Sequence, residues 1–258
     1  MTAPDLTDPG RVPSYDDVGP VGQPNVPILE LIDVHAAYGR IEVLRGVDLM
    51  VPRGAVMALL GANGAGKTSL LRVISGLMPS TGGHIHLSGV HINDASPDEL
   101  TRAGLTMVPE GRGVFPNLTV EENLWLASYS GQPVEKILAE AYARFPRLKE
   151  RRRQLAGSMS GGEQQMLSLA RSLASEPALL LLDELSMGLA PLIVESLYDS
   201  VAEIAEAGVS ILVVEQFASS ALRVSDYAAV MHGGRVIETG EPGEIESKLN
   251  ELYFGGGS

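Results

Sequence analysis

One short stretch limits what this chain can fold into more than any other feature. Residues 61–68 read Gly-Ala-Asn-Gly-Ala-Gly-Lys-Thr and match the pattern G-x-x-x-x-G-K-[ST] at every fixed position. Small residues let successive backbone N–H groups curve around a phosphate, and a following helix adds partial positive charge at its N-terminus. Because the loop needs a strand before it and a helix after it, it predicts an α/β fold with a nucleoside triphosphate site.

The sequence on either side of the loop supplies both elements. Residues 56–60 are wholly apolar, as in a strand that is buried on both faces of a sheet. Beyond Lys67, apolar residues recur at the spacing of one helix face: Leu70, Leu71, Val73, Ile74 and Leu77. Lys67 is predicted to reach the β- and γ-phosphates, and Thr68 to ligate Mg²⁺. The residues predicted to contact the nucleotide here are Gly61, Ala62, Asn63, Gly64, Ala65, Gly66, Lys67, Thr68 and Ser69.

A second apolar strand ends in two adjacent carboxylates. Residues 179–182 are four leucines, and Asp183 and Glu184 follow them. A strand beside the phosphate loop would bring Asp183 to the metal ion, through a water molecule. Glu184 points to another side of the chain and is predicted to orient the attacking water. Two solvated acids at a strand end are the alternative interpretation, and the phosphate loop upstream argues against it.

A third segment, Met-Ser-Gly-Gly-Glu-Gln-Gln at residues 159–165, indicates the family. Ser160 is predicted to cap a helix, and Glu163 to close a capping box. The same turn offers backbone N–H groups and a hydroxyl at a helix N-terminus, which makes it a second anion site. Two anion sites and a strand carboxylate pair in this order resemble the ABC ATPase family.

The resemblance implies that ATP is buried between two ATPase chains and that hydrolysis releases them. The turn of one chain, here Ser160, Gly161, Gly162 and Glu163, would bind the γ-phosphate of ATP held by the other. Tyr38 lies where the family places an aromatic that stacks on adenine, although packing within a strand is its alternative role. Residues 186–191 resemble the D-loop that bridges the two chains.

Two departures from the common family pattern narrow the match. Glu110 stands where most relatives have the Q-loop glutamine, and Gln216 stands where most have the switch histidine. Glu110 is predicted to contact Mg²⁺ or the water. Gln216 can bridge a water and a phosphate by hydrogen bonds, but unlike the histidine it cannot carry a proton at neutral pH. Leu185 and Ala190 also replace the usual proline and aspartate of the D-loop segment.

With both departures, the chain resembles the ATPases of branched-chain amino acid importers, specifically the second ATPase subunit (the LivF type). The resemblance extends from about residue 28 to the end of the sequence. The resemblance implies an enzyme that uses ATP and Mg²⁺, with a second ATPase subunit, two membrane permease subunits and an extracytoplasmic solute-binding protein as partners. A heterodimer with unequal sites is predicted from Gln216, and a homodimer remains open. The predicted solutes are leucine, isoleucine and valine; urea, amides or another small solute are the alternative.

Other functions of a phosphate loop agree less well with the sequence. Kinases and GTPases lack the Ser-Gly-Gly turn. ABC ATPases of chromosomes insert a long coiled coil, but the stretch from Lys67 to Ser160 shows no sustained heptads. Translation factors of this family carry two ATPase domains, whereas one is found here. The net charge of −13 argues against general nucleic-acid binding.

Composition also bears on location. The chain has no cysteine, and its apolar runs are far shorter than a membrane-spanning helix needs. No secretory signal pattern is found at the N-terminus. We therefore expect a cytoplasmic protein, peripheral on the inner face of the plasma membrane, with the pore formed by other chains.

The predicted organisation is a disordered tail, residues 1–27, followed by one ABC ATPase domain, residues 28–258. The fold class is α/β: a P-loop NTPase core with a parallel sheet, an antiparallel β subdomain, and a helical subdomain inserted at about residues 95–175. His84, His86 and His91 alternate on a predicted strand. No further ligands are evident near them, so the sequence gives little support for a metal there.

Overall fold

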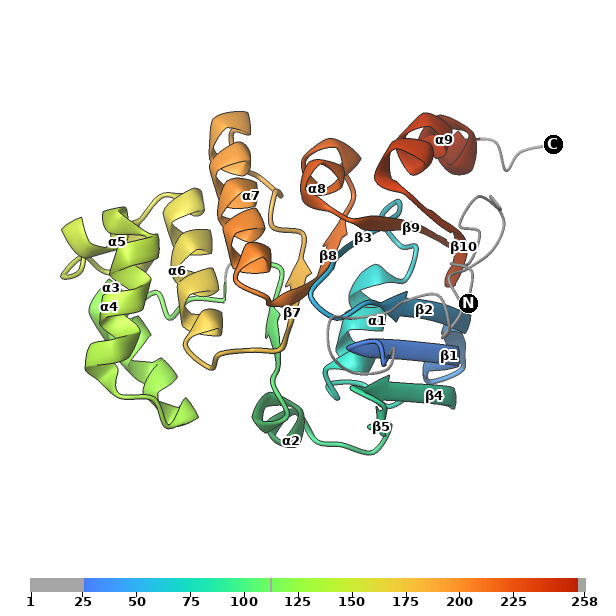
Figure 1. Cartoon of the computed structure of the whole chain (residues 1–258), viewed down its shortest axis with the longest axis horizontal. Helices are drawn as coiled ribbons and strands as arrows, with labels where there is room; N and C mark the ends of the chain where they lie inside the picture. Colours follow the sequence, from blue (N-terminus) through green and yellow to red (C-terminus); the bar gives the residue numbers. More distant parts are fainter. Residues whose placement is uncertain (1–25, 112, 255–258) are drawn as a thin grey trace, which may run out of the picture.

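The computed structural model describes residues 26–111 and 113–254. The predicted tail, residues 1–27, falls almost wholly outside this part of the chain. The described residues form two β-sheets and a group of helices (Figure 1). The α/β core with a parallel sheet, predicted from the sequence, is confirmed; the exact domain boundaries stay predictions.

The six-stranded sheet forms the centre of the fold. Its strands are β3 (Val56–Leu60), β6 (Leu105–Val108), β7 (Leu179–Asp183), β8 (Ser210–Glu215), β9 (Tyr227–His232) and β10 (Arg235–Gly240). Their order is β10-β9-β3-β8-β7-β6, and every neighbouring pair is parallel except β9 and β10. The parallel strands end at one edge, so β3, β7 and β8 deliver the residues that follow them to the same place.

A smaller antiparallel sheet packs beside this core. It contains β1 (Leu29–Tyr38), β2 (Ile41–Val51), β4 (Gly82–Leu87) and β5 (Val90–His91), in the order β2-β1-β4-β5. The backbone N–H of Arg45 donates a hydrogen bond to the Gly234 carbonyl at 2.9 Å, which joins the two sheets. This sheet is the predicted antiparallel β subdomain.

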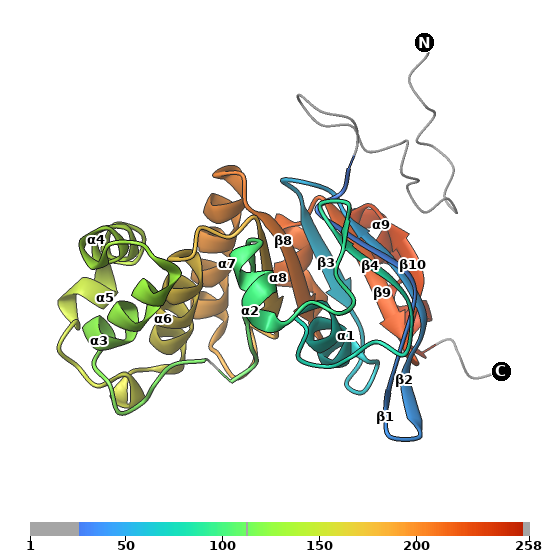
Figure 2. The same cartoon turned by 90° about the horizontal axis from the view of Figure 1, so that it is seen from below.

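Helices cover both faces of the central sheet. They are α1 (Lys67–Ile74), α2 (Pro97–Arg102), α3 (Val120–Trp125), α4 (Val134–Arg144), α5 (Pro146–Glu150), α6 (Gly161–Leu173), α7 (Pro191–Glu206), α8 (Ala218–Val224) and α9 (Pro242–Phe254), with short 3₁₀ helices η1 (Leu126–Ser130) and η2 (Ala156–Ser158). Helices α3 to α6 gather at one end of the molecule, opposite the antiparallel sheet (Figure 2). In the described residues, no helix combines the length and apolar character needed to cross a bilayer.

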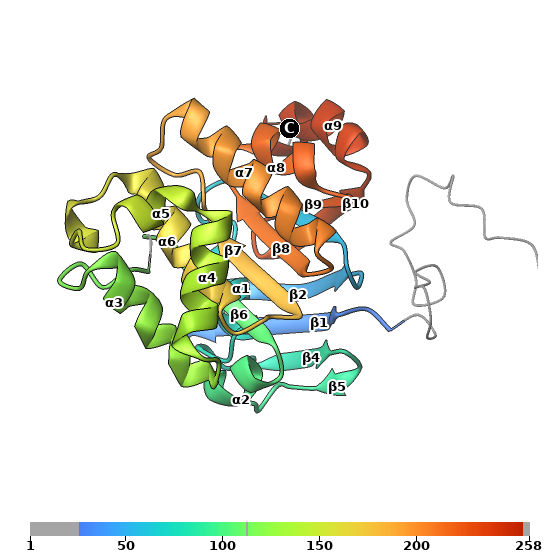
Figure 3. The ribbon, with the colours of Figure 1, turned by 60° about the vertical axis from the view of Figure 1, so that its left-hand side comes forward.

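The apolar strands explain this layering. Alternate residues of β3 enter different cores: Val56, Ala58 and Leu60 pack toward α6 to α9, whereas Met57 and Leu59 pack toward α1 and the antiparallel sheet. Figure 3 shows α7 and α8 on one side of β7 and β8, with β1 and β4 on the other. A strand with an apolar core on each side needs apolar residues at every position, as predicted for residues 56–60.

Three details differ from the sequence predictions. The single strand predicted to hold His84, His86 and His91 is broken into β4 and β5, because Ser88 and Gly89 both have positive φ angles (51° and 78°) and form a tight hairpin turn. The mostly helical stretch of residues 95–175 contains β6, which pairs with β7. Leu77, predicted on the helix face, lies beyond the end of α1 and is 63% exposed.

Candidate functional site

The phosphate loop, residues 61–68, joins the end of β3 to the start of α1 as predicted. Its backbone lies close to neighbouring segments. A Cβ on Gly61 would stand 2.5 Å from the carbonyl oxygen of Met231, and one on Gly66 would stand 3.0 Å from that of Val43. Gly66 also has a φ of 110°, which disfavours any side chain. Glycine at both positions is therefore required by space, and at Gly66 by backbone conformation as well.

Lys67 is buried at the first position of α1, with 4% of its surface exposed. Its Nζ donates hydrogen bonds to the carbonyl oxygens of Gly61, at 2.8 Å, and Ala62, at 3.3 Å. It also forms an ion pair with Glu184 Oε1 at 3.5 Å. The ammonium group thus bridges the loop and the carboxylate pair, and its carbonyl partners are ones that an anion in the loop could replace.

Asp183 and Thr68 meet across the sheet edge. The Thr68 hydroxyl donates to Asp183 Oδ1 at 3.5 Å, and Asp183 is 1% exposed. Its other oxygen, Oδ2, is buried without a hydrogen-bond partner among the described residues. Two causes raise the pKa of Asp183 to about 6: the larger is burial, and the next is the negative charge of Glu184. Because the folded protein disfavours the ionised form, the free energy of unfolding falls as pH rises from 3.8 to about 6. A cation bound at Oδ2 would offset that loss.

Glu184 is held in a strained backbone conformation. Its φ is 47°, in the left-handed region that costs a non-glycine residue on the order of 1–3 kcal/mol. The Glu184 N–H donates to the Val214 carbonyl at 2.9 Å, which extends the pairing of β7 with β8 by one residue. This conformation turns the side chain out of the strand direction and toward Lys67. Asp183 and Glu184 therefore face different parts of the same site.

Glu215, at the end of β8, is an additional residue of this region that the sequence analysis did not assign a role. It is 1% exposed and accepts hydrogen bonds from the Ser186 N–H (2.9 Å), the Ser186 hydroxyl (2.7 Å) and the Tyr198 hydroxyl (2.8 Å). Burial raises the pKa of Glu215. Its carboxylate ties β8 to the segment after Glu184, and the only sequence signal was a charged residue at the end of an apolar strand.

Leu185 strengthens the same anchor. The sequence analysis noted that it replaces the usual proline. Leu185 is wholly buried, and its carbonyl accepts a hydrogen bond from Gln165 Nε2 at 3.3 Å. The backbone after Glu184 is thus held by apolar burial at one residue and by Glu215 at the next.

We expect Glu215→Ala to lower the free energy of unfolding by about 2–3 kcal/mol, because it leaves the buried Tyr198 hydroxyl and two half-buried donors of Ser186 without their charged acceptor. ATPase activity should fall as well, since Ser186 and then Glu184 lose their support. Chemical denaturation and steady-state hydrolysis test this, with Glu206→Ala on the surface as the control. An unchanged denaturation midpoint would refute the anchoring role.

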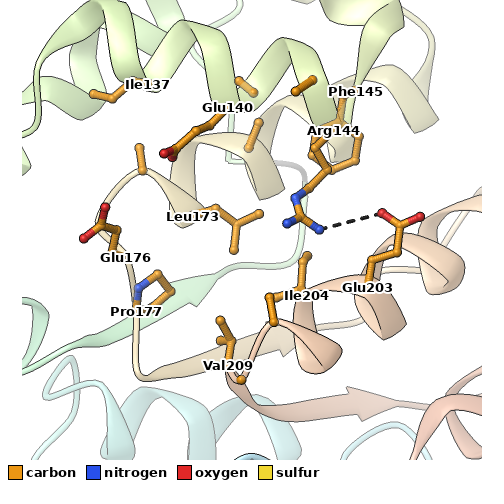
Figure 4. Close-up of a pocket in the computed structure, with 16 residues that line it drawn as sticks. Ile137, Glu140, Arg144, Phe145, Leu173, Glu176, Pro177, Glu203, Ile204 and Val209 are labelled. Atoms are coloured by element: carbon orange, nitrogen blue, oxygen red, sulfur yellow. Dashed lines mark ion pairs between the residues drawn. The ribbon is translucent and has the colours of Figure 1, made fainter.

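Glu184 and the loop line one cavity of about 620 Å³, and Asp183 lies behind Thr68 without lining it. Besides the loop, its walls include Glu110, Glu184 and, from β2, Ile41 and Arg45. A second cavity of about 620 Å³ lies between α4, the end of α6 and the end of α7, where Arg144 forms an ion pair with Glu203 (Figure 4). The two cavities cannot be distinguished by volume. The phosphate loop and Glu184 identify the first one as the candidate nucleotide site.

The turn at residues 160–163 does not line the cavity of the phosphate loop. Ser160 caps α6 and accepts a hydrogen bond from the Glu163 N–H, while Glu163 Oε2 accepts one from the Ser160 N–H at 3.0 Å, so the predicted capping box is present. Glu163 also forms an ion pair with Arg151 at 2.8 Å. Within one chain, this turn therefore does not line the cavity of the phosphate loop, and its role as a second anion site stays a prediction.

Gly162 packs against the start of α7. A Cβ there would stand 2.2 Å from Cγ2 of Ile193, so Gly162→Ala should destabilise the protein by about 1–3 kcal/mol through overpacking. Ile193→Ala removes the methyl group that clashes and should recover part of that loss. A double-mutant cycle on unfolding free energies measures the coupling. Additive effects of the two substitutions would show that the close approach is not the cause.

Tyr38 and Gln216 lie near the site but are not among the residues that line its cavity. The Tyr38 hydroxyl accepts a hydrogen bond from Arg72 at 3.2 Å, and 46% of the residue is exposed at the end of β1. Gln216 follows β8 and is partly exposed, two residues beyond Val214, which pairs with Asp183. The structure thus brings Lys67, Thr68, Asp183, Glu184 and Glu110 together. The adenine role of Tyr38 and the switch role of Gln216 stay predictions.

Comparison with known proteins decides the family. A family model described as ABC transporter matches residues 44–186, which is more than half of the chain. The matched span contains the phosphate loop, the capped turn and the carboxylate pair. The chain belongs to the ABC transporter ATPase family. It is accordingly the ATP-binding subunit of such a transporter, and the enzyme activity predicted from the sequence is confirmed at this level.

Two relatives resemble this ABC transporter ATPase over nearly their whole length. The high-affinity branched-chain amino acid transport ATP-binding protein BraG of Pseudomonas aeruginosa is 40% identical, over 89% of this chain and 100% of the relative. The probable branched-chain amino acid transport ATP-binding protein LivF of Archaeoglobus fulgidus is 34% identical, over 88% and 99%. The resemblance to branched-chain importer ATPases is thereby confirmed.

Solved structures confirm the fold class. An ATP-binding cassette of an ABC transporter in its ADP conformation is 25% identical and has a TM-score of 0.78, covering 87% of this chain and 95% of that one. A dimeric, post-hydrolysis cassette bound to ADP and Pi is 25% identical with a TM-score of 0.74, covering 83% and 98%. The two sheets and the inserted helices are therefore those of an ABC ATPase.

Proposed function

We propose that this ATPase energises uptake of leucine, isoleucine and valine through a separate membrane permease. The observation that carries the proposal is the end-to-end match to two relatives named for branched-chain amino acid transport. Glu110 and Gln216, the two departures from the common family pattern, agree with that subunit type. An importer for urea, amides or another small solute is the alternative, because the solute would not touch this chain.

ATP would bind along the phosphate loop. On binding, the Lys67 ammonium exchanges the carbonyl oxygens of Gly61 and Ala62 for the β- and γ-phosphate oxygens, which are stronger acceptors because they are charged. Backbone N–H groups of the loop and the start of α1 surround the β-phosphate. The exposed ring of Tyr38 is available for stacking on adenine, and Ser69, which lines the cavity, would contact the α-phosphate.

Thr68, Asp183 and Glu110 would hold Mg²⁺. Three observations support this set: the hydroxyl of Thr68 and the carboxylate of Asp183 already meet, Asp183 Oδ2 is buried without a partner in the described part of the chain, and Glu110 lines the same cavity as Thr68. Oxygen atoms are the ligands that Mg²⁺ prefers. When bound, the ion neutralises charge on the phosphate oxygens.

Glu184 is the proposed base that orients the attacking water. Its strained backbone directs the carboxylate into the cavity, and its ion pair with Lys67 places it beside the group that would hold the γ-phosphate. Gln216, next to the end of β8, can bridge that water and the γ-phosphate by hydrogen bonds. Glu215 acts through Ser186 as a positioning residue for this arrangement.

The active form would contain two ATPase chains. The turn at residues 160–163 would close on the γ-phosphate of ATP in a partner chain, since it lies outside its own chain's nucleotide cavity. Gln216 leads us to propose a heterodimer in which the partner supplies the better site. We expect the isolated chain to hydrolyse ATP slowly and to gain activity when the partner ATPase is added. Full activity of the isolated chain as an ATP-driven homodimer would refute this.

The permease would dock near the Q-loop, which places the complex at the inner face of the plasma membrane, with a solute-binding protein delivering solute outside. Phe115, Trp125 and Tyr129 expose large apolar surfaces there. The Arg171 guanidinium lies 4.8 Å from the Phe115 ring centroid and donates a hydrogen bond to the Gly113 carbonyl, so α6 supports this surface. Closing and opening of the two ATPases would reach the permease through these residues.

Uptake of labelled leucine, isoleucine and valine, with urea and short amides in parallel, tests the proposed function in cells that carry Glu184→Gln. We expect branched-chain uptake to fall while the other solutes enter normally. If another solute stops entering instead, the proposed substrate is wrong. If no uptake changes, the importer role itself is wrong.

A further inference from the structure

The three histidines that alternate in the sequence form a cluster on the antiparallel sheet. His84 and His86 lie on the same face of β4, and His91 on β5 is the direct cross-strand partner of His86. The tight turn at Ser88 and Gly89 is what brings His91 back beside them. The ring centroids of the three imidazoles are 5.3, 5.4 and 6.3 Å apart. Histidines that met only solvent would not need to converge in this way.

Two of the rings already have the nitrogen spacing of a shared metal ion. His84 Nδ1 and His91 Nε2 are 3.2 Å apart. Two nitrogens bound at about 2.05 Å to a tetrahedral Zn²⁺ are roughly 3.3 Å apart, and their ring centroids are roughly 5 Å apart. A hydrogen bond between the two imidazoles shares this spacing but not the direction of the nitrogens, because hydrogen-bonded nitrogens point at each other and metal ligands both point at the ion. Both rings must therefore turn before a metal ion can replace the shared proton.

Glu30 supplies a carboxylate that the sequence analysis did not connect with these histidines. It lies on β1, where it pairs with His86 of β4, and its Oε2 is 3.4 Å from His86 Nδ1, within ion-pair distance. Nδ1 is buried and forms no hydrogen bond with the described residues, so a small turn of either side chain is needed for Glu30 to accept its proton. Both side chains are largely covered, with 23% and 25% exposed. A carboxylate on one imidazole nitrogen orients the ring and makes the other nitrogen, Nε2, a better metal ligand.

We propose that His84, His86 and His91 form a binding site for a divalent transition metal of the zinc type, with Glu30 orienting His86. As the side chains of the described residues stand, no group of three or more His, Asp or Glu could hold a metal ion, so the proposed site forms only when the rings turn. The His84 and His86 rings are inclined by only 24°, so the His86 ring must turn about its Cβ–Cγ bond to bring Nε2 to the ion. That torsion has a broad energy minimum, and three imidazoles form a known zinc ligand set.

This site is separate from the nucleotide cavity, whose lining contains none of these four residues. A bound ion would fasten the short β5 strand, of only two residues, to β4 and β1. The site is independent of which solute the transporter carries, because all four residues belong to the antiparallel sheet.

Zinc titration of the full chain, without an affinity tag and with excess Mg²⁺ to occupy oxygen-ligand sites, tests the proposal. We expect about one equivalent of Zn²⁺ by calorimetry. The melting temperature should rise by roughly 5–10 °C at a hundredfold excess over Kd. His84→Ala and His91→Ala should each abolish both effects, and Glu30→Gln should weaken binding roughly 10-fold. His232→Ala, an exposed histidine on the other sheet, is the control.

Circular dichroism and ATP binding would establish that each variant is folded. Chemical shifts of the ring nitrogens give a second measurement that does not rely on stability, since metal binding should shift those of all three histidines. Zinc binding that survives His84→Ala and His91→Ala, or that is lost equally in His232→Ala, would overturn the proposal. An absence of binding in the unsubstituted protein would overturn it as well.

Discussion

Glu184→Gln should abolish steady-state ATP hydrolysis while leaving ATP binding intact. Glutamine has nearly the same size as glutamate and can still accept a hydrogen bond through its amide oxygen, so the shape of the cavity is preserved. It cannot take a proton from the attacking water, and general-base catalysis contributes typically 10²–10⁴-fold. We therefore expect turnover to fall at least roughly 10²-fold, and ATP to accumulate unhydrolysed between the paired ATPase chains.

The measurement is phosphate release under saturating Mg-ATP, with nucleotide binding determined in parallel. Glu206→Gln, an exposed glutamate at the end of α7, makes the same chemical change away from the site and should be silent. The ion pair between Lys67 and Glu184 predicts a side effect: the variant loses a negative charge near the phosphates, so ATP affinity should rise slightly. Normal turnover in Glu184→Gln would remove the residue from the role of base.

The sequence predicted those parts of the site that are formed by consecutive residues. The phosphate loop, the carboxylate pair and the capped turn are each contiguous, and each is fixed by a strand end or a helix start. Motifs at the ends of parallel strands can also be expected to lie close to one another, because parallel strands end at the same edge of the sheet. For that reason Asp183 could be placed beside Thr68 from the sequence alone, and the structure brings them to 3.5 Å.

Interactions between distant segments could not be predicted in this way. Glu215 and Ser186 are 29 residues apart, and nothing in either local pattern indicates that one would hold the other. Glu30 and His86 meet only because β1 and β4 are neighbours, a pairing that depends on the whole antiparallel sheet. A short strand such as β6 was also hidden among helices, because four residues give too little periodicity to distinguish a strand from a helix.

The structure also changes how replacements in a motif should be judged. Leu185 and Glu215 are both unusual for their positions: Leu185 replaces a proline, and Glu215 places a carboxyl group in the core. Together they hold the segment after Glu184 from two sides, by core packing and by three hydrogen bonds. A buried carboxylate is costly unless its partners are complete. Here the partners are present, so a charge at the end of an apolar strand serves as an anchor.

Lys67→Ala should weaken ATP binding more than any other single substitution in the phosphate loop. The substitution removes the ammonium group that would bind the β- and γ-phosphates, and hydrogen bonds to charged groups contribute about 1.5–3 kcal/mol each. ATP affinity should therefore fall roughly 10- to 100-fold for each hydrogen bond to phosphate that the variant cannot make. The change also leaves Glu184, only 9% exposed, without its ion-pair partner, so the negative charge repels the γ-phosphate as well.

Two comparisons separate these causes. Lys248→Ala removes a half-buried lysine that pairs with Glu238 away from the nucleotide cavity and should leave ATP affinity unchanged. Adding Glu184→Gln to Lys67→Ala should restore part of the missing affinity, because it removes the repulsion without replacing the ammonium group. Equilibrium binding of ATP to the four proteins of this cycle gives the coupling between Lys67 and Glu184. If Lys67→Ala bound ATP as tightly as the unsubstituted protein, the loop would not be the nucleotide site, and the cavity beside it would need another ligand.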